Sequence, residues 1–264
     1  MRVVWLTDIH LNFLAEPSVA PFLDSVKDVS PDAVLIGGDI AEAHDLVDYL
    51  QRIDSALEVP VYFVLGNHDY YHGRVADVRR RVAGLCAQRP LLHYLSVGPA
   101  VSLTPTSGLV GHDGWADARL GDYERSMVLM NDYRLIVDFI GLGKRARRAE
   151  LERLGDEAAA HLARVLPPAL AAHEQVYVLT HVPPFREACW HQGRLSNDEW
   201  APHFTCRAVG EALLAAATDF PHRQLTVLCG HTHGAGQCRI RDNLVVFTGG
   251  AEYCRPEIQR VFDL

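Results

Sequence analysis

Short apolar runs alternate with amphipathic segments through the first third of the chain. Three runs rich in β-branched residues predict buried strands: 2–7, 33–36 and 59–65. Each is followed by a segment whose apolar residues lie three and four positions apart, which predicts amphipathic helices at 17–29, 42–57 and 74–88. Strand–helix units of about 30 residues in succession indicate parallel βαβ connections, and therefore an α/β fold.

The remainder of the chain is less regular. The patterning predicts short strands within 91–112, a helix over 147–166, a strand at 176–180, a helix over 206–218, a strand at 225–229, a hairpin over 237–248 that turns at Asp242-Asn243, and an edge strand formed by the last residues. Two segments rich in aromatic, charged and turn-forming residues follow no clean period. We therefore predict a single domain over 1–264, with an irregular insert at about 113–145 and a long loop at about 182–205.

Composition and charge exclude several classes of protein. Hydrophobic residues make up 48% of the 264 residues and charged residues 22%, which is typical of a globular protein and excludes a disordered, collagen-like or coiled-coil chain. The net charge of −8 argues against a broad basic face for long duplex nucleic acid or an anionic membrane. The six cysteines form no CxxC pair, no run approaches the roughly 20 apolar residues of a membrane span, and no signal peptide is evident, so we expect a cytoplasmic protein.

Polar clusters follow five of the predicted strands directly. They are Asp8-Ile9-His10, Gly38-Asp39, Gly66-Asn67-His68-Asp69, Thr180-His181 and Gly230-His231-Thr232-His233. In open α/β sheets, ligands bind outside the carboxyl ends of the strands. We therefore expect these clusters to meet along one edge of the protein.

The residue types in these clusters indicate a metal site. Seven side chains offer a carboxylate, amide or imidazole donor: Asp8, His10, Asp39, Asn67, His181, His231 and His233. A mixed oxygen and nitrogen donor set suits Mn, Fe or Zn. Seven donors are too many for one four-coordinate zinc, but they suit two ions that share a bridging carboxylate and keep positions open for water and substrate.

Each cluster alone has a simpler explanation. Asp-x-His by itself is more often part of a surface loop, Gly-Asn-His-Asp is built from turn-forming residues, and His181 by itself could be a buried histidine of the core. Gly-His-Thr-His is the stronger single signal, because residues at i and i+2 point to the same side of an extended segment. All five clusters, in order and each behind an apolar run, favour the metal site.

The same clusters carry a resemblance to the calcineurin-like metallophosphoesterases. That signature is Asp-x-His, Gly-Asp-x-x-Asp/Glu, Gly-Asn-His-Asp/Glu, a lone His and Gly-His-x-His, and this chain has Gly38-Asp39-Ile40-Ala41-Glu42 as its second element. The resemblance implies a four-layer αββα sandwich of two mixed sheets. It also implies that Asp8, His10 and His233 hold one ion, that Asn67, His181 and His231 hold the other, and that Asp39 bridges them. His68 would then face the leaving group as a catalytic residue, with Asp69 orienting or charging it.

The substrate is defined less sharply. His72, His112, Trp115 and Arg119 are candidate substrate contacts, although each could equally be an ordinary exposed or loop residue. We expect hydrolysis of a small phosphodiester or nucleotide, with a phosphomonoester as the alternative substrate. A third alternative is a protein-interaction module that keeps the fold without catalysis.

Overall fold

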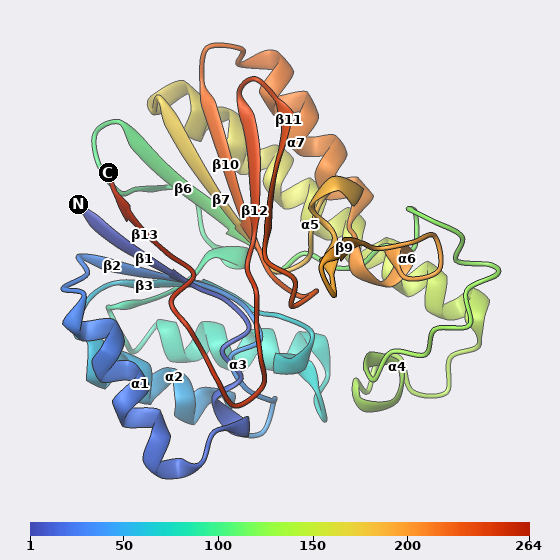
Figure 1. Ribbon diagram of the computed structural model, residues 1–264, viewed down its shortest axis with the longest axis horizontal. Coiled ribbons are helices and arrows are strands. Elements are labelled where there is room, and N and C mark those ends of the chain that lie inside the picture. Colours follow the sequence, from blue (N-terminus) through green and yellow to red (C-terminus); the bar gives the residue numbers. More distant parts are fainter.

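Two β-sheets lie face to face, each covered by helices on its outer side, in the computed structural model, which describes residues 1–264 (Figure 1). The first sheet has the strand order β13-β1-β2-β3-β4. Its strands are β1 (Arg2–Leu6), β2 (Ala33–Gly37), β3 (Val61–Val64), β4 (Leu92–Tyr94) and β13 (Arg260–Asp263). Strands β1 to β4 are parallel, and β13 adds an antiparallel edge beside β1.

The second sheet has the strand order β11-β12-β10-β7-β6-β5. Its strands are β5 (Val101–Ser102), β6 (Ser107–His112), β7 (Gln175–Thr180), β10 (Gln224–Cys229), β11 (Gly236–Arg241) and β12 (Leu244–Thr248). The four central strands are parallel, and the two edge strands are antiparallel to their neighbours. Both sheets are therefore mixed, as expected.

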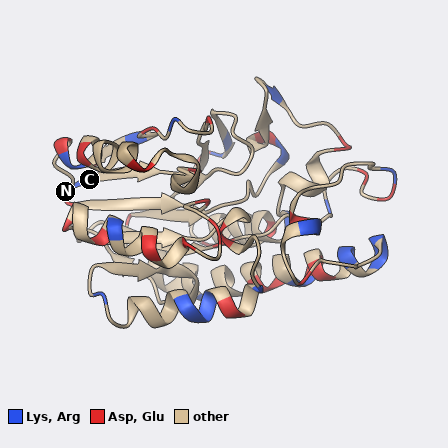
Figure 2. Ribbon diagram, turned by 90° about the horizontal axis from the view of Figure 1, so that it is seen from below, with Lys and Arg blue, Asp and Glu red and all other residues tan.

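Five helices form the outer layers. The first sheet is covered by α1 (Glu16–Asp28), α2 (Leu46–Leu57) and α3 (Val75–Cys86), and the second by α5 (Lys144–Ala172) and α7 (Arg207–Asp219). Short 3-10 turns lie at Leu11–Phe13 (η1), His68–Tyr70 (η2), Leu95–Val97 (η3) and Arg186–Ala188 (η4). No helix is long and apolar enough to cross a membrane. Acidic and basic residues are mixed over the helices and loops (Figure 2).

Alternation along the strands builds the layers. In β1, Val4 and Leu6 pack into the core under α1–α3, whereas Val3 and Trp5 pack into the core between the two sheets. Successive side chains of a strand point to opposite faces, so a strand buried on both faces reads as one continuous apolar run. A third core lies between the second sheet and α5 and α7. Three cores between four layers confirm the αββα sandwich.

Helix bounds differ from the predicted ones at two places. Helix α2 begins at Leu46, and residues 42–45 instead form a turn in which the Glu42 amide donates to the Asp45 carboxylate at 3.0 Å. Helix α5 continues to Ala172, although Pro167 and Pro168 interrupt its hydrogen bonds. Leu166, Ala169 and Leu170 on either side of the prolines are buried in the core, so packing offsets the missing hydrogen bonds.

The insert and the long loop lie side by side at one end of the sandwich (Figure 1). The insert contains only one helical turn, α4 (Asp132–Leu135), and the loop contains the short strands β8 (Trp190–His191) and β9 (Arg194–Leu195) and the turn α6 (Ala201–Phe204). Hydrogen bonds join them: the Asp122 amide donates to the Asp198 carbonyl at 2.7 Å, and the Ser126 hydroxyl donates to the Glu199 carbonyl at 2.8 Å.

Asp113 holds the two sheets together beside the predicted site. It follows β6 of the second sheet, and its carboxylate accepts from the Leu65 amide, at the end of β3 of the first sheet, at 2.8 Å. The same carboxylate accepts from the hydroxyls of Tyr70 and Tyr94, both at 2.6 Å, and from Arg79 at 3.1 Å. Burial would raise the pKa of Asp113, but the Arg79 guanidinium and these hydrogen bonds hold it below its usual value.

Replacing Asp113 with Ala is expected to lower the free energy of unfolding by about 3–5 kcal/mol, because it leaves Arg79 and two tyrosine hydroxyls without their buried partner. Urea unfolding measures the loss. The control is Asp77→Ala, which removes an exposed ion pair with Arg80 and should cost less than about 1 kcal/mol. Equal losses of unfolding free energy in the two variants would contradict the role of Asp113 in holding the two sheets together.

Candidate metal centre

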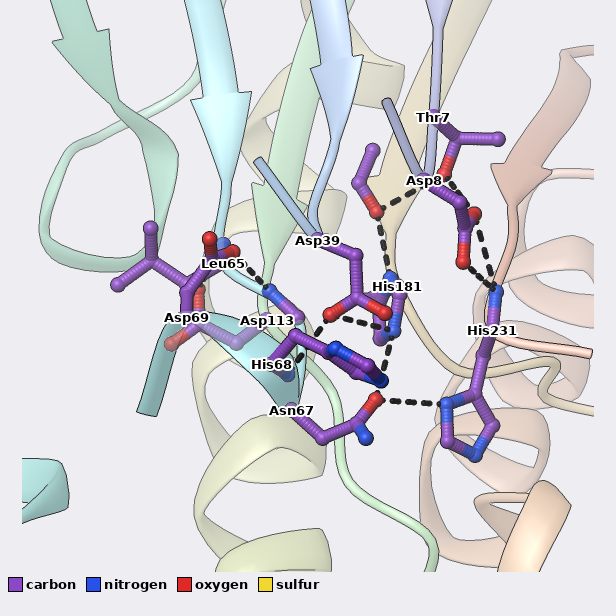
Figure 3. Close-up of polar contacts among 12 residues, drawn as sticks. Thr7, Asp8, Asp39, Leu65, Asn67, His68, Asp69, Asp113, His181 and His231 are labelled. Carbon is purple, nitrogen blue, oxygen red and sulfur yellow. Dashed lines mark hydrogen bonds and ion pairs between the residues drawn. The ribbon is translucent and has the colours of Figure 1, made fainter. Parts of the chain in front are cut away.

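All seven predicted ligands gather at the edge where the strands of both sheets end. Figure 3 shows five of them there: Asp8, Asp39, Asn67, His181 and His231. Asp8 and His10 follow β1, Asp39 follows β2, and Asn67 follows β3 in the first sheet. From the second sheet, His181 follows β7, and His231 and His233 follow β10. The carboxyl ends of parallel strands meet at one edge, and the two sheets present that edge to each other.

One group of donors consists of Asp8, His10, Asp39 and His233. One ligand atom from each of the four side chains lies within 4.8 Å of those of the others. The Nε2 atoms of His10 and His233 are 3.3 Å apart, and Nε2 of His233 is 3.5 Å from a carboxylate oxygen of Asp8. Asp8 is in turn held by the Thr7 hydroxyl at 2.6 Å and the His231 amide at 3.0 Å.

A second group consists of Asn67, His181 and His231. The side-chain oxygen of Asn67 lies 3.0 Å from Nε2 of His181 and 2.8 Å from Nδ1 of His231. The other nitrogen of each ring faces a backbone carbonyl, which only accepts: Nδ1 of His181 is 2.8 Å from the Gly37 oxygen, and Nε2 of His231 is 3.1 Å from the His203 oxygen. In neutral imidazoles these bonds take the single N–H.

Three lone pairs therefore converge in the second group without a hydrogen between them. Such an arrangement is repulsive unless a cation lies among the three atoms, and fixing the tautomer by a carbonyl on the far nitrogen is typical of metal-binding histidines. The residues present thus fit a metal ion.

Asp39 faces both groups. Its Oδ1 lies 3.4 Å from Nε2 of His181 in the second group, and its Oδ2 lies 3.7 Å from Nε2 of His10 in the first. Oδ1 also accepts from the His68 amide at 2.8 Å, which fixes the carboxylate plane. Asp39 therefore has the geometry of a bridging ligand.

Burial sets the protonation of the cluster in the protein without cations. It lowers the pKa of His10 and of His231 to about 3, and it also lowers the pKa of His181, so these imidazoles are neutral as metal ligation requires. Burial and the adjacent Asp8 carboxylate raise the pKa of Asp39 well above its usual value. For Asp8 burial acts in the same direction, but it is outweighed, chiefly by a hydrogen bond from His233, and the pKa is lowered. Bound cations would offset the cost of burying the two carboxylates side by side.

The backbone at the ligands is strained. Five of the seven have a positive φ: Asp8 (50°), His10 (41°), Asp39 (52°), His231 (71°) and His233 (56°). Residues other than glycine in this region cost of order 1–3 kcal/mol each, and they persist at functional sites that the surrounding structure holds in place. This concentration of strain at the strand ends marks the cluster as a functional site.

Gly230 is required by the close approach of Asp8. A Cβ at this position would overlap the Asp8 carboxylate and the Thr7 hydroxyl. Gly230→Ala is therefore expected to weaken metal binding and to destabilise the protein by about 1–3 kcal/mol through overpacking. Metal analysis and thermal unfolding measure both effects.

The matched control is Gly84→Ala. Gly84 is exposed within α3, and a Cβ there meets nothing within 4 Å. This substitution should stabilise the protein by about 0.5–1 kcal/mol and leave metal content unchanged. A Gly230 variant that keeps wild-type metal content would contradict the steric argument.

His68 lies beside the cluster without joining either group of ligands. Its ring is 4.6 Å from that of His10 and 4.3 Å from that of Tyr71, measured between centroids. Burial lowers the pKa of His68 to about 2, and its Nδ1 is buried without a hydrogen-bond partner. His68 also lines the pocket over the cluster, so its ring lies where a substrate would contact it.

No hydrogen bond joins the Asp69 carboxylate to the His68 imidazole, so the expected role of Asp69 in orienting or charging His68 stays a prediction. Its carboxylate accepts from the backbone amides of Ile40 and Ala41, both at 2.9 Å, and of Gly66 at 2.8 Å. Asp69 therefore ties the loop after β2 to the loop after β3, which places Asp39 and Asn67 relative to each other. These three hydrogen bonds give Asp69 a structural role in the site.

An open pocket of about 330 Å³ lies over the cluster. Besides five of the predicted site residues, it is lined by Tyr71, Leu129, Met130, Asn131, His191, Trp200, Phe204, Thr232 and Tyr253. The lining contains no Lys or Arg. The sequence offered one signal for these residues, the aromatic residues of the two irregular segments.

None of the four predicted substrate contacts lines this pocket. Arg119 is held by Asp117 at 3.2 Å and Asp156 at 2.7 Å, and His112 is buried with its ring 5.2 Å from that of His161. Trp115 is buried between Tyr70 and Phe139, behind the ligands. His72 is exposed and lies 3.6 Å from Glu42. The structure therefore does not support their predicted role, because local sequence placed them near the motifs without showing where their side chains point.

Comparison with known proteins agrees with the fold and the cluster. The profile of the calcineurin-like phosphoesterase family matches residues 1–235. An uncharacterised metallophosphoesterase of Campylobacter jejuni is 37% identical over 87 residues, which are 31% of this chain and 23% of the relative. A probable cyclic nucleotide phosphodiesterase of Pseudoalteromonas sp. strain SM9913 is 30% identical over 82 residues, 26% of this chain and 31% of the relative. The chain thus spans less than a third of the length of these relatives.

The fold is also that of a solved dimetal phosphatase from Danio rerio. The TM-score is 0.58 at 16% sequence identity, over 95% of this chain and 87% of the other. The family profile covers every motif in the cluster, from Asp8 to His233. This protein belongs to the calcineurin-like phosphoesterase family.

Proposed function

We propose that this protein uses two divalent metal ions to hydrolyse a small phosphodiester or a nucleotide. Asp8, His10 and His233 would hold one ion, Asn67, His181 and His231 the other, and Asp39 both, in agreement with the two groups of donors described above. Two such ions would supply an activated water and neutralise charge on the phosphoryl oxygens. The ions could be Mn, Fe or Zn, since each accepts this mixed donor set.

The residues of the chain divide the remaining work. Asp39 and Asn67 would fix the positions of the two groups of donors relative to each other, so that an attacking water and the leaving group can lie in line. His68, whose low pKa keeps its imidazole neutral, would contact the leaving oxygen and stabilise its negative charge with a hydrogen bond. The aromatic walls of the pocket exclude water from the organic parts of the substrate.

The lining of the pocket is the observation that favours a diester. A phosphomonoester is a dianion, and proteins usually grip its free oxygens with Arg or Lys. This pocket has neither, so metal ions would be its only cations. A diester carries a single negative charge and a second organic group that needs a contact surface.

The pocket offers two such surfaces, one on each side of the cluster. Tyr253 stands beside His10, His68 and His233, with ring centroids 4.7 Å from His10 and 5.1 Å from His233. Beside the second group, the Phe204 ring lies 5.3 Å from that of His231 and stacks with Trp200 at 5.2 Å. Flat aromatic groups of a substrate stack well on such side chains, and the name of the Pseudoalteromonas relative is consistent with a nucleotide diester.

The test compares bis(4-nitrophenyl) phosphate with 4-nitrophenyl phosphate on protein loaded with Mn, Fe or Zn. We expect kcat/KM to be at least about tenfold higher for the diester, equivalent to about 1.4 kcal/mol of transition-state binding. The reverse ratio would contradict the diester preference and indicate a phosphomonoesterase. Hydrolysis of neither ester, nor of cyclic or linear nucleotides, by protein carrying two ions would contradict enzymatic function and favour an interaction module.

A further inference from the structure

We infer that two adjacent residues of the insert, Asp132 and Tyr133, are positioning residues for the second group of donors. They orient Asn67 and His231 and thereby set the affinity for one of the two metal ions. This inference rests on the proposed two-metal function. It gives the insert, which none of the sequence motifs covers, a specific part in the site.

Asp132 determines which way the Asn67 amide points. Its buried carboxylate accepts from the Asn67 side-chain nitrogen and from the Tyr71 hydroxyl, both at 2.9 Å. The Asn67 nitrogen also lies 3.2 Å from the Tyr71 oxygen. An inverted amide would place the Asn67 oxygen against the carboxylate oxygen, which is repulsive. The amide oxygen is therefore held toward His181 and His231, where a ligand to a cation is needed.

Tyr133 acts on His231 through His203 of the neighbouring loop. The Ser126 hydroxyl donates to the Glu199 carbonyl, so at 2.9 Å from Nε2 of His203 it accepts the N–H of that ring. Nδ1 of His203 is then the acceptor for the Tyr133 hydroxyl. This chain of hydrogen bonds fixes α6 at the point where the His203 carbonyl accepts from Nε2 of His231.

The consequence is asymmetric. Two of the three donors in the second group depend on α4 of the insert, directly or through one residue. The first group has no such contact: Asp8 is held by Thr7 and the His231 amide, and His10 and His233 contact each other and the carboxylates. Loss of the α4 contacts should therefore lower the affinity for the ion held by the second group and leave the affinity for the other ion unchanged.

The experiment measures metal ions bound per chain, with free Mn²⁺ or Zn²⁺ held at graded concentrations by a chelator buffer. For Asp132→Ala we expect the affinity for one ion to fall about 10–100-fold, the usual effect of removing a group that orients a ligand, with the other ion unchanged. Asp132→Asn keeps a carbonyl that can accept from Asn67 and should restore much of the affinity. Tyr133→Phe should lower the affinity for the same ion by a smaller factor. This second variant tests the proposal if Asp132→Ala folds poorly.

The control variant is Asp122→Ala. Asp122 belongs to the same insert, but its carboxylate pairs with Arg125 and contacts no proposed ligand. Affinity for both ions should match that of the wild type. The unfolding midpoint of metal-stripped protein separates positioning from stability, because a purely structural role would lower that midpoint and weaken both ions together.

Several outcomes would overturn the inference. These are equal weakening of both ions in Asp132→Ala, unchanged affinity for both in Asp132→Ala and Tyr133→Phe, or no recovery in Asp132→Asn. If the wild-type protein binds two ions and the variants give one of these results, only the proposed role of α4 is contradicted. Wild-type protein that binds no ion at all would contradict the proposed function as well.

Discussion

Asp39→Asn is expected to remove both metal ions and to lower kcat/KM by about 10³-fold or more. Asp39 alone faces both groups of donors, with one carboxylate oxygen toward His181 and the other toward His10. An amide offers one weak oxygen ligand where the two ions need a shared anion. A loss of about 4 kcal/mol of transition-state stabilisation by two metals corresponds to that factor.

Metal analysis and the unfolding midpoint give independent readouts for this variant. The neutral side chain removes a buried charge beside Asp8, so the metal-stripped variant should unfold at a temperature no lower than metal-stripped wild type. The variant should gain no stability when metal is added, unlike the wild type. Asp48→Asn, an exposed substitution on α2, is the control and should behave as wild type. A variant that still carries two ions per chain would contradict the bridging role.

His68→Ala is expected to lower turnover by about 10²–10³-fold while both metal ions stay bound, the usual effect of removing one hydrogen-bond donor to a developing negative charge. The loss should be larger for an alkyl or nucleoside leaving group than for 4-nitrophenolate, because a good leaving group needs little help from a hydrogen bond. Steady-state kinetics on a series of diesters, combined with metal analysis, measures both parts of this prediction.

His72→Ala is the matched control, since His72 lies four residues further on, is exposed and does not line the pocket. Its kinetics should match those of the wild type. If His68→Ala loses metal, the residue acts on the ligands and its assigned contact with the leaving group is wrong. A loss independent of the leaving group would also contradict that role.

Much of the fold was readable from the order of apolar runs. Strand β1 carries Val3, Val4, Trp5 and Leu6 in a row, and such a run belongs to a strand buried on both faces. A polar residue directly behind such a run has to lie at the carboxyl edge of a sheet. For that reason the sequence alone predicts that the clusters from Asp8 to His233 lie together at the carboxyl edge of the sheets.

Side-chain contacts were hardest to predict where the partners are distant in the chain. Asp69 precedes Tyr70 and follows His68, and proximity in sequence suggested a contact with the imidazole. The three amides that it accepts from belong to Gly66 and to Ile40 and Ala41, the last two in a different loop. The sequence makes Arg119 a candidate substrate contact, but its side chain pairs with Asp156 of α5 and does not line the pocket.

Residue type and spacing were sufficient for the α/β fold, for the donor motifs and for the resemblance to the family, which in turn implied the sandwich. Apolar runs and the polar residues that follow them are local properties of the chain. Only the folded structure shows the aromatic lining of the pocket, the group of donors that each Asp39 oxygen faces, and the hydrogen bond from Asn67 to Asp132. These features depend on where Tyr253, Trp200 and α4 come to rest against segments remote in sequence, and no local pattern specifies a contact between two irregular loops.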